Sequence, residues 1–327
     1  MIASILNAII SIVMSVVCAF ASPLNLWTKA DLTPVDPGNV RVTFATMSDV
    51  HLDDTYLRKT ILELGLKDFE SSDYKPDALI LMGDNTDHGF LEQYEYLADI
   101  FSKYDPAGRI HMMLGNHDTW TEDRGTILAH RYYKQYYKQI TGYEVDEVYS
   151  SMVINGYHFI TLSSEENMTP AYISQKQLDW LESELTTASR DGKPIFVLCH
   201  WPINQTHGLP DTFQDHIEDP KSGGLGEQSE QVDAILQKYD NVFYITGHIH
   251  SGVTNDLTAK LNGYSSIEKH GKVTCVNCPS FQFFSERGVL INGTGYVFEV
   301  YDDEVKIRVR SYIGGFWLNN YEYDISL

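Results

Sequence analysis

Apolar runs alternate with longer stretches of mixed polarity along residues 42–246. Most positions within each run are apolar, which is typical of strands that are covered on both faces of a parallel sheet. The runs are Val42–Met47, Ala78–Met82, Ile110–Leu114, Ile195–Cys199 and Val242–Thr246. Helical stretches are expected between them, including Thr55–Ser71, Leu91–Tyr104 and Ser174–Ala188. Strands that alternate with helices predict an α/β fold with parallel strands.

The later part of the chain shows hairpin signals. Ser151–Ile154 and Tyr157–Leu162 flank Asn155-Gly156, and Tyr296–Tyr301 and Val305–Arg310 flank three acidic residues. Asn-Gly between two apolar runs is a strong turn signal. We therefore expect two mixed β-sheets packed face to face, with helices outside, in one domain over residues 41–327.

Two segments fall outside this pattern of strands and helices. Residues 22–40, which contain Pro23, Pro34 and Pro37, are expected to form a lead-in before the domain. Residues 202–230 are rich in Gly, Pro, Asn and Asp and are too long for a plain connection. Because this segment directly follows the fourth apolar run, we predict a lid or a loop that selects the substrate.

A short block of metal-binding side chains follows each apolar run. The blocks are Asp49-Val50-His51, Gly83-Asp84-Asn85, Gly115-Asn116-His117-Asp118, His200 and Gly247-His248-Ile249-His250. Sites in α/β sheets form where the parallel strands end, so these blocks are expected to converge. Their oxygen and imidazole donors, without a thiol, suit Mn, Fe, Zn or Co. Seven donors suit two divalent or trivalent ions that share a carboxylate, and such a centre attracts phosphate esters.

The order D-x-H, G-D, G-N-H-D, H, G-H-x-H resembles the calcineurin-like metallophosphoesterase superfamily. The resemblance spans roughly residues 42 to 250, and its specificity lies in the five blocks occurring in order. It implies a four-layer α/β/β/α sandwich and a hydrolase that acts on phosphoric esters. Each block taken alone could also have a purely structural role, since a lone histidine such as His200 is more often a hydrogen-bonded core residue. Their joint occurrence favours the metal site.

The resemblance also implies roles for individual residues. One metal is held by Asp49, His51, Asp84 and His250, and the other by Asp84, Asn116, His200 and His248. Asp84 then bridges the two ions, and a hydroxide between them attacks phosphorus in line. His117 is implied to protonate the leaving oxygen, with Asp118 orienting its ring.

Differences between the second block and the motifs of related families narrow the range of expected substrates. The second block reads G-D-N-T-D-H-G, which is similar to class III cyclic-nucleotide phosphodiesterases. His88 stands where Ser/Thr protein phosphatases carry a phosphate-binding Arg, and Asp87 stands where purple acid phosphatases carry a tyrosine ligand. Arg124 and Lys221 are the cations that we find near the blocks, and this small number favours a diester, which carries one negative charge. A phosphomonoesterase or nucleotidase is the alternative, followed by a non-catalytic surface protein that binds metal or phosphate.

Several residues are candidates for substrate contact. They are Asn116, His117, Trp120, Trp201 and His207. Either tryptophan is expected to stack on a base or another apolar leaving group, or else to pack in the core. His207 is expected either to bind substrate or to lie in a surface loop.

Charge and the first residues bear on partners and location. The formal net charge of −21 disfavours nucleic acid polymers and anionic membranes, so a small soluble phosphoester is the expected partner. The apolar run Ile2–Phe20 ends in Ala-Phe-Ala-Ser, which predicts a signal peptide over residues 1–21 and a secreted or extracytoplasmic protein. An uncleaved membrane anchor is the alternative. Cys275 and Cys278 are expected to serve packing. The oligomeric state is left open.

Overall fold

The computed structural model describes residues 26–120, 126–166, 170–208, 224–281, 288 and 293–327. The predicted signal peptide, Arg124 and Lys221 lie outside the described residues, as do residues 209–223 of the predicted lid. Within the described ranges, no helix has both the length and the apolar character needed to span a bilayer.

The first sheet contains seven strands among the described residues. Their order is β1 (Trp27–Thr28), β13 (Phe316–Ser326), β12 (Glu304–Ser311), β11 (Thr294–Val300), β2 (Val42–Met47), β3 (Ala78–Leu81) and β4 (Ile110–Met112). β2, β3 and β4 run parallel, whereas the C-terminal strands pair antiparallel and join the sheet through β11 and β2. The sheet is therefore mixed, as expected from the sequence.

The second sheet contains six strands in the described part of the chain. Their order is β5 (Ser150–Ile154), β6 (Tyr157–Thr161), β7 (Ile195–Leu198), β8 (Val242–Thr246), β10 (Val273–Asn277) and β9 (Ile267–His270). The four central strands are parallel, and β5 and β9 are antiparallel edges. β5 and β6 form the expected hairpin, with Asn155 and Gly156 both at positive φ.

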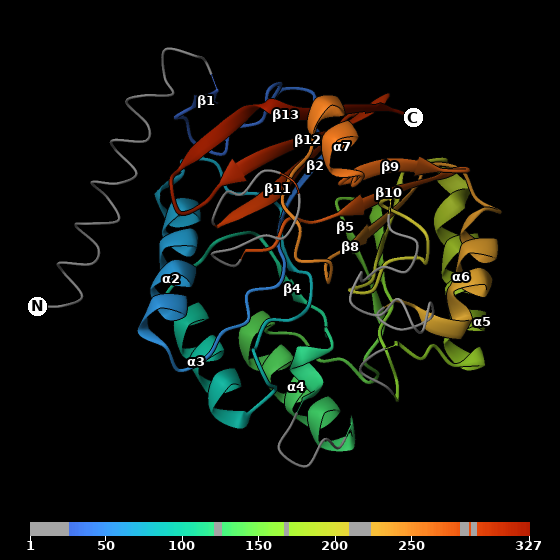
Figure 1. Cartoon of the computed structure of the whole chain (residues 1–327), viewed down its shortest axis with the longest axis horizontal. Coiled ribbons are helices and arrows are strands. Elements are labelled where there is room, and N and C mark those ends of the chain that lie inside the picture. The colour runs from blue at the N-terminus through green and yellow to red at the C-terminus, as the bar shows by residue number, and fades with distance from the viewer. Residues whose placement is uncertain (1–25, 121–125, 167–169, 209–223, 282–287, 289–292) are drawn as a thin grey trace, which may run out of the picture.

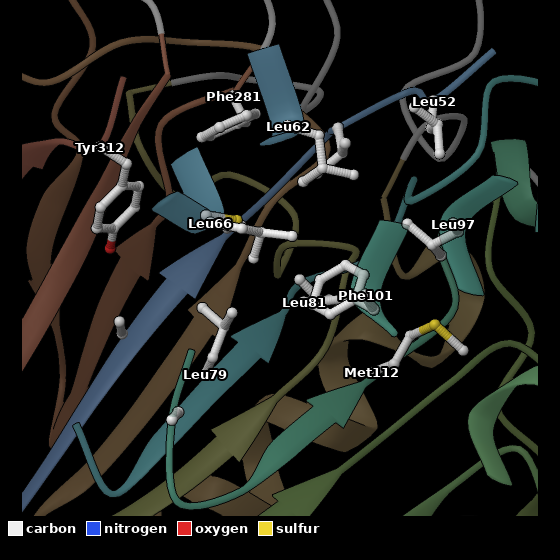
Figure 2. Close-up of a cluster of buried hydrophobic side chains, with 14 of the residues drawn as sticks. Leu52, Leu62, Leu66, Leu79, Leu81, Leu97, Phe101, Met112, Phe281 and Tyr312 are labelled. Atoms are coloured by element: carbon white, nitrogen blue, oxygen red, sulfur yellow. The ribbon is translucent and has the colours of Figure 1, made fainter. Parts of the chain in front are cut away.

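Helices cover the outer faces of the two sheets (Figure 1). α2 (Tyr56–Ser71), α3 (Leu91–Phe101) and α4 (Thr126–Thr141) lie over the first sheet; α5 (Gln175–Ala188) and α6 (Ser229–Leu236) lie over the second; and α7 (Asp256–Asn262) follows β8. Figure 2 shows the apolar cluster on the helix-covered face of the first sheet, where Leu62 and Leu66 of α2 lie near Leu79 and Leu81 of β3.

A separate core fills the space between the sheets. Phe44 of the first sheet packs 4.8 Å from Phe196 of the second, measured between ring centroids, and 5.0 Å from Phe159. Aromatic pairs in such edge-to-face contact add about 0.5–1.5 kcal/mol beyond the burial of their area. The predicted four-layer α/β/β/α sandwich is confirmed.

The lead-in is more closely integrated than expected. Trp27 pairs with Leu318 across the β1–β13 ladder, and the indole N–H of Trp317 donates to the carbonyl oxygen of Asp31. Leu32 is buried against the first sheet. The described part of the lead-in therefore belongs to the domain, and it supplies an edge strand that two residues alone do not signal in the sequence.

Candidate metal centre

The predicted ligands lie on loops that leave the carboxyl ends of β2, β3, β4, β7 and β8. Several contacts join the sheets at this edge, and two of them involve the backbone. The backbone N–H of His248 donates to Asp49 Oδ1 at 3.1 Å, and an isolated bridge pairs Ser48 with Ser280. The site is therefore built where both sheets meet.

Close packing explains two of the glycines. A Cβ at Gly115 would lie 2.1 Å from Asp84 Oδ1, and one at Gly247 would lie 2.1 Å from Ser48 Oγ. Any larger residue would displace the ligand loops. Of the three block glycines, Gly83 alone has a positive φ, 91°, so tight turns are only part of the reason for them.

The ligand loops also hold an unusual backbone conformation. Residues with L side chains rarely adopt positive φ, and those that do collect at functional sites. Five predicted ligands have it: Asp49 (53°), His51 (44°), Asp84 (49°), His248 (73°) and His250 (52°). The backbone strain at these residues accompanies the convergence of their side chains on one point.

Asp49, His51, Asp84 and His250 form the first donor group, with ligand atoms within 4.8 Å of one another. His51 Nε2 lies 2.9 Å from His250 Nε2, and His250 Nε2 lies 3.3 Å from Asp49 Oδ1. Ligands bound at 2.0–2.2 Å around one ion are spaced by roughly 3 Å. The four atoms therefore have the spacing of a coordination shell.

Asp84, His200 and His248 form the second donor group. His200 Nε2 lies 3.2 Å from His248 Nδ1 and 3.3 Å from Asp84 Oδ2. Asp84 belongs to both groups, so its carboxylate would be shared by two ions if both were bound. Asn116 is flanked by Gly115 and His117, which both approach Asp84. Its buried Oδ1 accepts no hydrogen bond among the described residues, as a metal-binding oxygen requires.

In two of the predicted histidine ligands, a hydrogen bond at one ring nitrogen determines which nitrogen faces the site. His200 Nδ1 lies 2.8 Å from the carbonyl oxygen of Met82, and His51 Nδ1 lies 3.2 Å from Asp87 Oδ1. An acceptor at Nδ1 holds the proton there and leaves Nε2 free to bind a cation. Both rings thus present the atom that the donor groups use.

The charges of the site call for cations. Burial opposes ionisation of Asp49, but its hydrogen bond to His250 and the charges of His250 and His200 lower its pKa to about 2. Burial opposes protonation of His200 as well, yet Asp84 and Asp49 raise its pKa to about 9. With this pKa, the His200 ring would carry a proton at neutral pH when no metal is bound. Binding of metal would displace it, so the donor set fits two ions such as Mn, Fe, Zn or Co.

His117 lies beside the donor groups with its orientation fixed. Its backbone N–H donates to Asp84 Oδ1 at 2.8 Å, and its ring centroid is 4.3 Å from that of His51. His117 Nδ1 lies 2.7 Å from the carbonyl oxygen of Asp87. Ligand atoms of His51, Asp87 and His117 also fall within 4.8 Å of one another, but hydrogen bonds account for that group.

The prediction that Asp118 orients the His117 ring is wrong. The Asp118 carboxylate accepts from Gly115 N at 3.0 Å, from Thr86 N and Oγ1 at 2.8 Å each, and from Asn85. Neighbouring residues in the short 3-10 turn His117–Thr119 point in different directions, so Asp118 turns into the core. Asp118 ties the second block to the third, and the Asp87 carbonyl orients His117.

The other candidates for substrate contact differ in burial: two are buried and one is partly exposed. Trp201 is buried in the core beneath the second sheet, with its ring 5.3 Å from that of His200, so it does not face substrate. His207 is also buried. Its ring Nδ1 lies 2.8 Å from the Ser265 carbonyl oxygen, and its backbone N–H donates to the Glu268 carboxylate. Its polar contacts in the described part of the chain are therefore with the β9 region. Trp120, in contrast, is 37% exposed, and its ring lies 4.1 Å from that of His117.

The described part of the predicted lid packs into the fold at its start. Ile203 and Thr206 are buried, and Leu225 N donates to the carbonyl oxygen of Pro202. Cys199, Cys275 and Cys278 are free and buried, which agrees with a packing role.

Two residues, Arg58 and Asp87, support the ligands without a role having been predicted for them from the sequence. Arg58 Nη1 lies 2.6 Å from Asp87 Oδ1 and also donates to the carbonyl oxygen of His51. Asp87 therefore joins the second block to the first. Its position three residues after Asp84 is a signal for this role, whereas Arg58 stands within an ordinary helix and has none.

The comparisons with known proteins agree with this geometry. The family model described as calcineurin-like phosphoesterase matches residues 42–252, so the chain belongs to that family. A curated relative from Rhodococcus erythropolis, described as a probable cyclic nucleotide phosphodiesterase, is 30% identical over 222 residues. That match covers 63% of this chain and 65% of the relative, which is less than two thirds of its length.

Solved structures share the fold at low identity. A dimetal phosphatase from Danio rerio aligns with a TM-score of 0.56 and 14% identity, over 88% of this chain and 99% of its own. GAP50, described as the anchor in the inner membrane complex of Plasmodium, aligns with a TM-score of 0.54 and 14% identity, over 88% of this chain and 89% of its own. At such identities the likeness shows the fold alone, and the function depends on the site.

Proposed function

We propose that this protein hydrolyses a small phosphodiester with the help of two metal ions. The observation that carries the proposal is the sharing of Asp84 between two donor groups, with His117 beside them and not needed as a ligand. When bound, two cations supply positive charge for the phosphoryl oxygens and lower the pKa of a coordinated water. Family membership supports a hydrolase that acts on phosphoric ester bonds.

The residues of the chain supply orientation and a proton. The Asp87 carbonyl oxygen occupies Nδ1 of the His117 ring, which leaves Nε2 as the nitrogen available to a bound ester. A histidine there donates its proton as the phosphorus–oxygen bond to the leaving group breaks, while an oxygen from water forms the new bond. The leaving group departs as an alcohol.

A diester is favoured because few cations surround the ligands. Among the described residues, Arg58 is the cation in contact with this cluster, and Asp87 and Asp53 engage it. A monoester dianion generally needs additional cationic donors. The relative from Rhodococcus erythropolis is likewise described as a probable cyclic nucleotide phosphodiesterase. A phosphomonoesterase is the second candidate, because residues outside the described ranges include Arg124 and Lys221.

The test compares bis-p-nitrophenyl phosphate with p-nitrophenyl phosphate on protein of measured metal content. We expect about two ions per chain after loading with Mn²⁺ and a higher kcat/KM for the diester. A preference for the monoester would support the second candidate. A fully loaded protein that hydrolyses neither ester, nor any other in a broad panel, would contradict the enzymatic proposal and favour a metal- or phosphate-binding surface protein.

We further propose that the protein is exported and meets its substrate outside the cytoplasm. The apolar run Ile2–Phe20 with its Ala-Phe-Ala end supports cleavage after residue 21, and the charge of −21 supports a small soluble substrate over a nucleic acid polymer. N-terminal sequencing of the mature protein, with fractionation of the host cells, tests both export and the alternative of a retained anchor.

A further inference from the structure

A row of ring side chains leads from the metal centre to the surface. His51 and His117 lie 4.3 Å apart between ring centroids, and His117 and Trp120 lie 4.1 Å apart. Beyond them, His88 lies 6.2 Å from Trp120 and 5.4 Å from Phe90, on which it stacks. The inner and outer parts of this row differ in exposure, since His51 is 1% exposed, whereas Trp120 is 37% exposed and the His88 side chain is 47% exposed. The outer rings therefore present an aromatic surface to solvent beside His117.

The outer rings are held in place by polar contacts. The backbone N–H of Trp120 donates to the carbonyl oxygen of His117 at 3.2 Å, which closes the 3-10 turn that carries both residues. His88 Nδ1 lies 2.9 Å from Asp87 Oδ2, and the same Asp87 holds His51 and His117. The aromatic surface thus has a fixed position relative to the catalytic histidine.

Large rings that are exposed in fixed positions leave apolar surface in water, which is unfavourable and is not offset by burial in the core. Among the described residues, Trp120 is not a member of the apolar clusters of the two sheets, and its ring contacts are with His117 and His88. Flat rings at an open site offer stacking to a flat partner, and nucleobases stack on aromatic side chains regardless of their sequence. Because His117 lies between Trp120 and the metal ligands, this partner would extend from the reacting phosphate on the side of the leaving oxygen.

We propose that Trp120 and His88, supported by Phe90, form a stacking wall that selects phosphodiesters carrying a nucleobase. The inference rests on the proposed phosphodiesterase function and specifies its substrate class. The wall contacts the base and takes no part in proton transfer. Its loss should therefore affect base-bearing esters far more than otherwise identical esters without a base.

The experiment uses two pairs of esters that differ only in the base. Adenosine 3′,5′-cyclic phosphate is compared with the 3′,5′-cyclic phosphate of 1-O-methylribose, and the methyl ester of adenosine 5′-phosphate with its base-free counterpart. The measured quantity is the ratio of kcat/KM within the pair that the metal-loaded enzyme hydrolyses faster. Trp120→Ala and His88→Ala are compared with the unmodified enzyme, with Trp120→Phe as the conservative variant. Tyr143→Ala is the matched control, because Tyr143 is 48% exposed and packs on Arg109 away from the ligands.

We expect the unmodified enzyme to prefer the base-bearing ester, and Trp120→Ala to reduce that ratio by about tenfold. His88→Ala should reduce it less, Trp120→Phe should retain most of it, and Tyr143→Ala should leave it unchanged. An equal fall on both esters would show that Trp120 only supports His117, and it would overturn the inference. So would hydrolysis of bis-p-nitrophenyl phosphate without any preference for a base. Inactivity of the loaded enzyme on all of these esters would instead contradict the proposed function.

Discussion

His117 Nδ1 lies 2.7 Å from the backbone carbonyl oxygen of Asp87. A carbonyl oxygen only accepts hydrogen bonds, so Nδ1 must carry a hydrogen and Nε2 is the nitrogen that can exchange a proton with substrate. A backbone partner also means that no side-chain substitution at residue 87 removes this contact directly. The proposed acid is thus oriented by the main chain of the second block.

The first prediction concerns His117 and the leaving group. His117→Ala should lower kcat by about 10²–10⁴-fold for esters with alkyl leaving groups, because these alkoxides need a proton as they depart. The loss should be far smaller for p-nitrophenolate, which departs as a stable anion. The ion content should stay that of the unmodified protein. Equal losses on both kinds of ester would refute the acid role.

The second prediction concerns the shared carboxylate. Asp84→Ala should remove both ions, because Asp84 belongs to both donor groups. Asp49→Ala should weaken mainly the first group, to which Asp49 is confined. Elemental analysis after dialysis measures the ions per chain. Asp54→Ala, which changes an exposed carboxylate on the loop after His51, is the control and should keep the full content. Retention of one tightly bound ion by Asp84→Ala would argue against bridging.

The third prediction concerns the support of His51 by Asp87. Asp87→Asn weakens the acceptor at His51 Nδ1 and the contact with Arg58, so affinity for the first ion should fall by about 10–100-fold. Competition with a chelator of known affinity measures this change. Asp99→Asn alters an exposed carboxylate paired with Lys103 and serves as the matched control. An unchanged affinity would mean that His51 needs no carboxylate partner.

The fourth prediction concerns pH and the buried His111 of β4. Its ring nitrogens lie 3.0 Å from the Tyr137 hydroxyl and 2.8 Å from Thr161 Oγ1, and burial lowers its pKa from 6.5 to about 3. Between these values the unfolded chain binds a proton that the folded chain does not. Stability must therefore fall as the pH drops from about 6.5 toward 3, by about 1.4 kcal/mol per pH unit.

Denaturant unfolding of the metal-free protein at pH 7 and pH 5 measures this effect. The loss of unfolding free energy between the two pH values should be about 2 kcal/mol smaller in His111→Gln than in the unmodified chain. His158→Gln, at a partly exposed strand position, is the control. An identical loss in His111→Gln and the unmodified chain would show that His111 is not the group responsible.

The fifth prediction compares two arginine–aspartate pairs of the same chemistry. Arg310 binds Asp68 through Nε at 2.5 Å and Nη2 at 2.7 Å, with the two side chains 2% and 7% exposed. Arg41 binds Asp302 through two contacts as well, but those side chains are 46% and 71% exposed. Arg310→Met should cost about 3–5 kcal/mol, since it leaves a buried carboxylate unpaired. Arg41→Met should have a much smaller effect on stability, because solvent screens the charges of that exposed pair.

Calorimetry or denaturant unfolding of both variants checks this difference. The double variant Arg310→Met with Asp68→Leu should regain part of the loss, because an apolar pair leaves no buried charge. Equal costs for the two single variants would show that burial does not decide the strength of these pairs.

The strand ends could be predicted from the sequence because two independent signals coincide there. An apolar run such as Val242–Thr246 has one stable place, the buried sheet, and a polar block directly after it must lie at the edge. Parallel pairing then brings the blocks together without knowledge of any side-chain contact. The two donor groups around Asp84 follow from this arrangement of the backbone.

Side-chain direction within a block was harder to predict. Asp118 and His117 are neighbours in the chain, yet their side chains contact different partners because the turn between them is a short 3-10 helix. Trp201 and His207 follow a ligand strand and resemble loop residues in the sequence, but tertiary packing buries both. Arg58 supports the site from a helix, where spacing and composition give no sign of its contact with Asp87. Long-range contacts decide these outcomes.

The contact between His248 N and Asp49 Oδ1 joins loops from different sheets, and each donor group draws ligands from both. Bound cations would therefore act as a clamp across the sandwich as well as catalytic groups. Strong chelators in the surroundings would loosen the two halves and shorten the lifetime of the protein against proteases, even while no substrate is present.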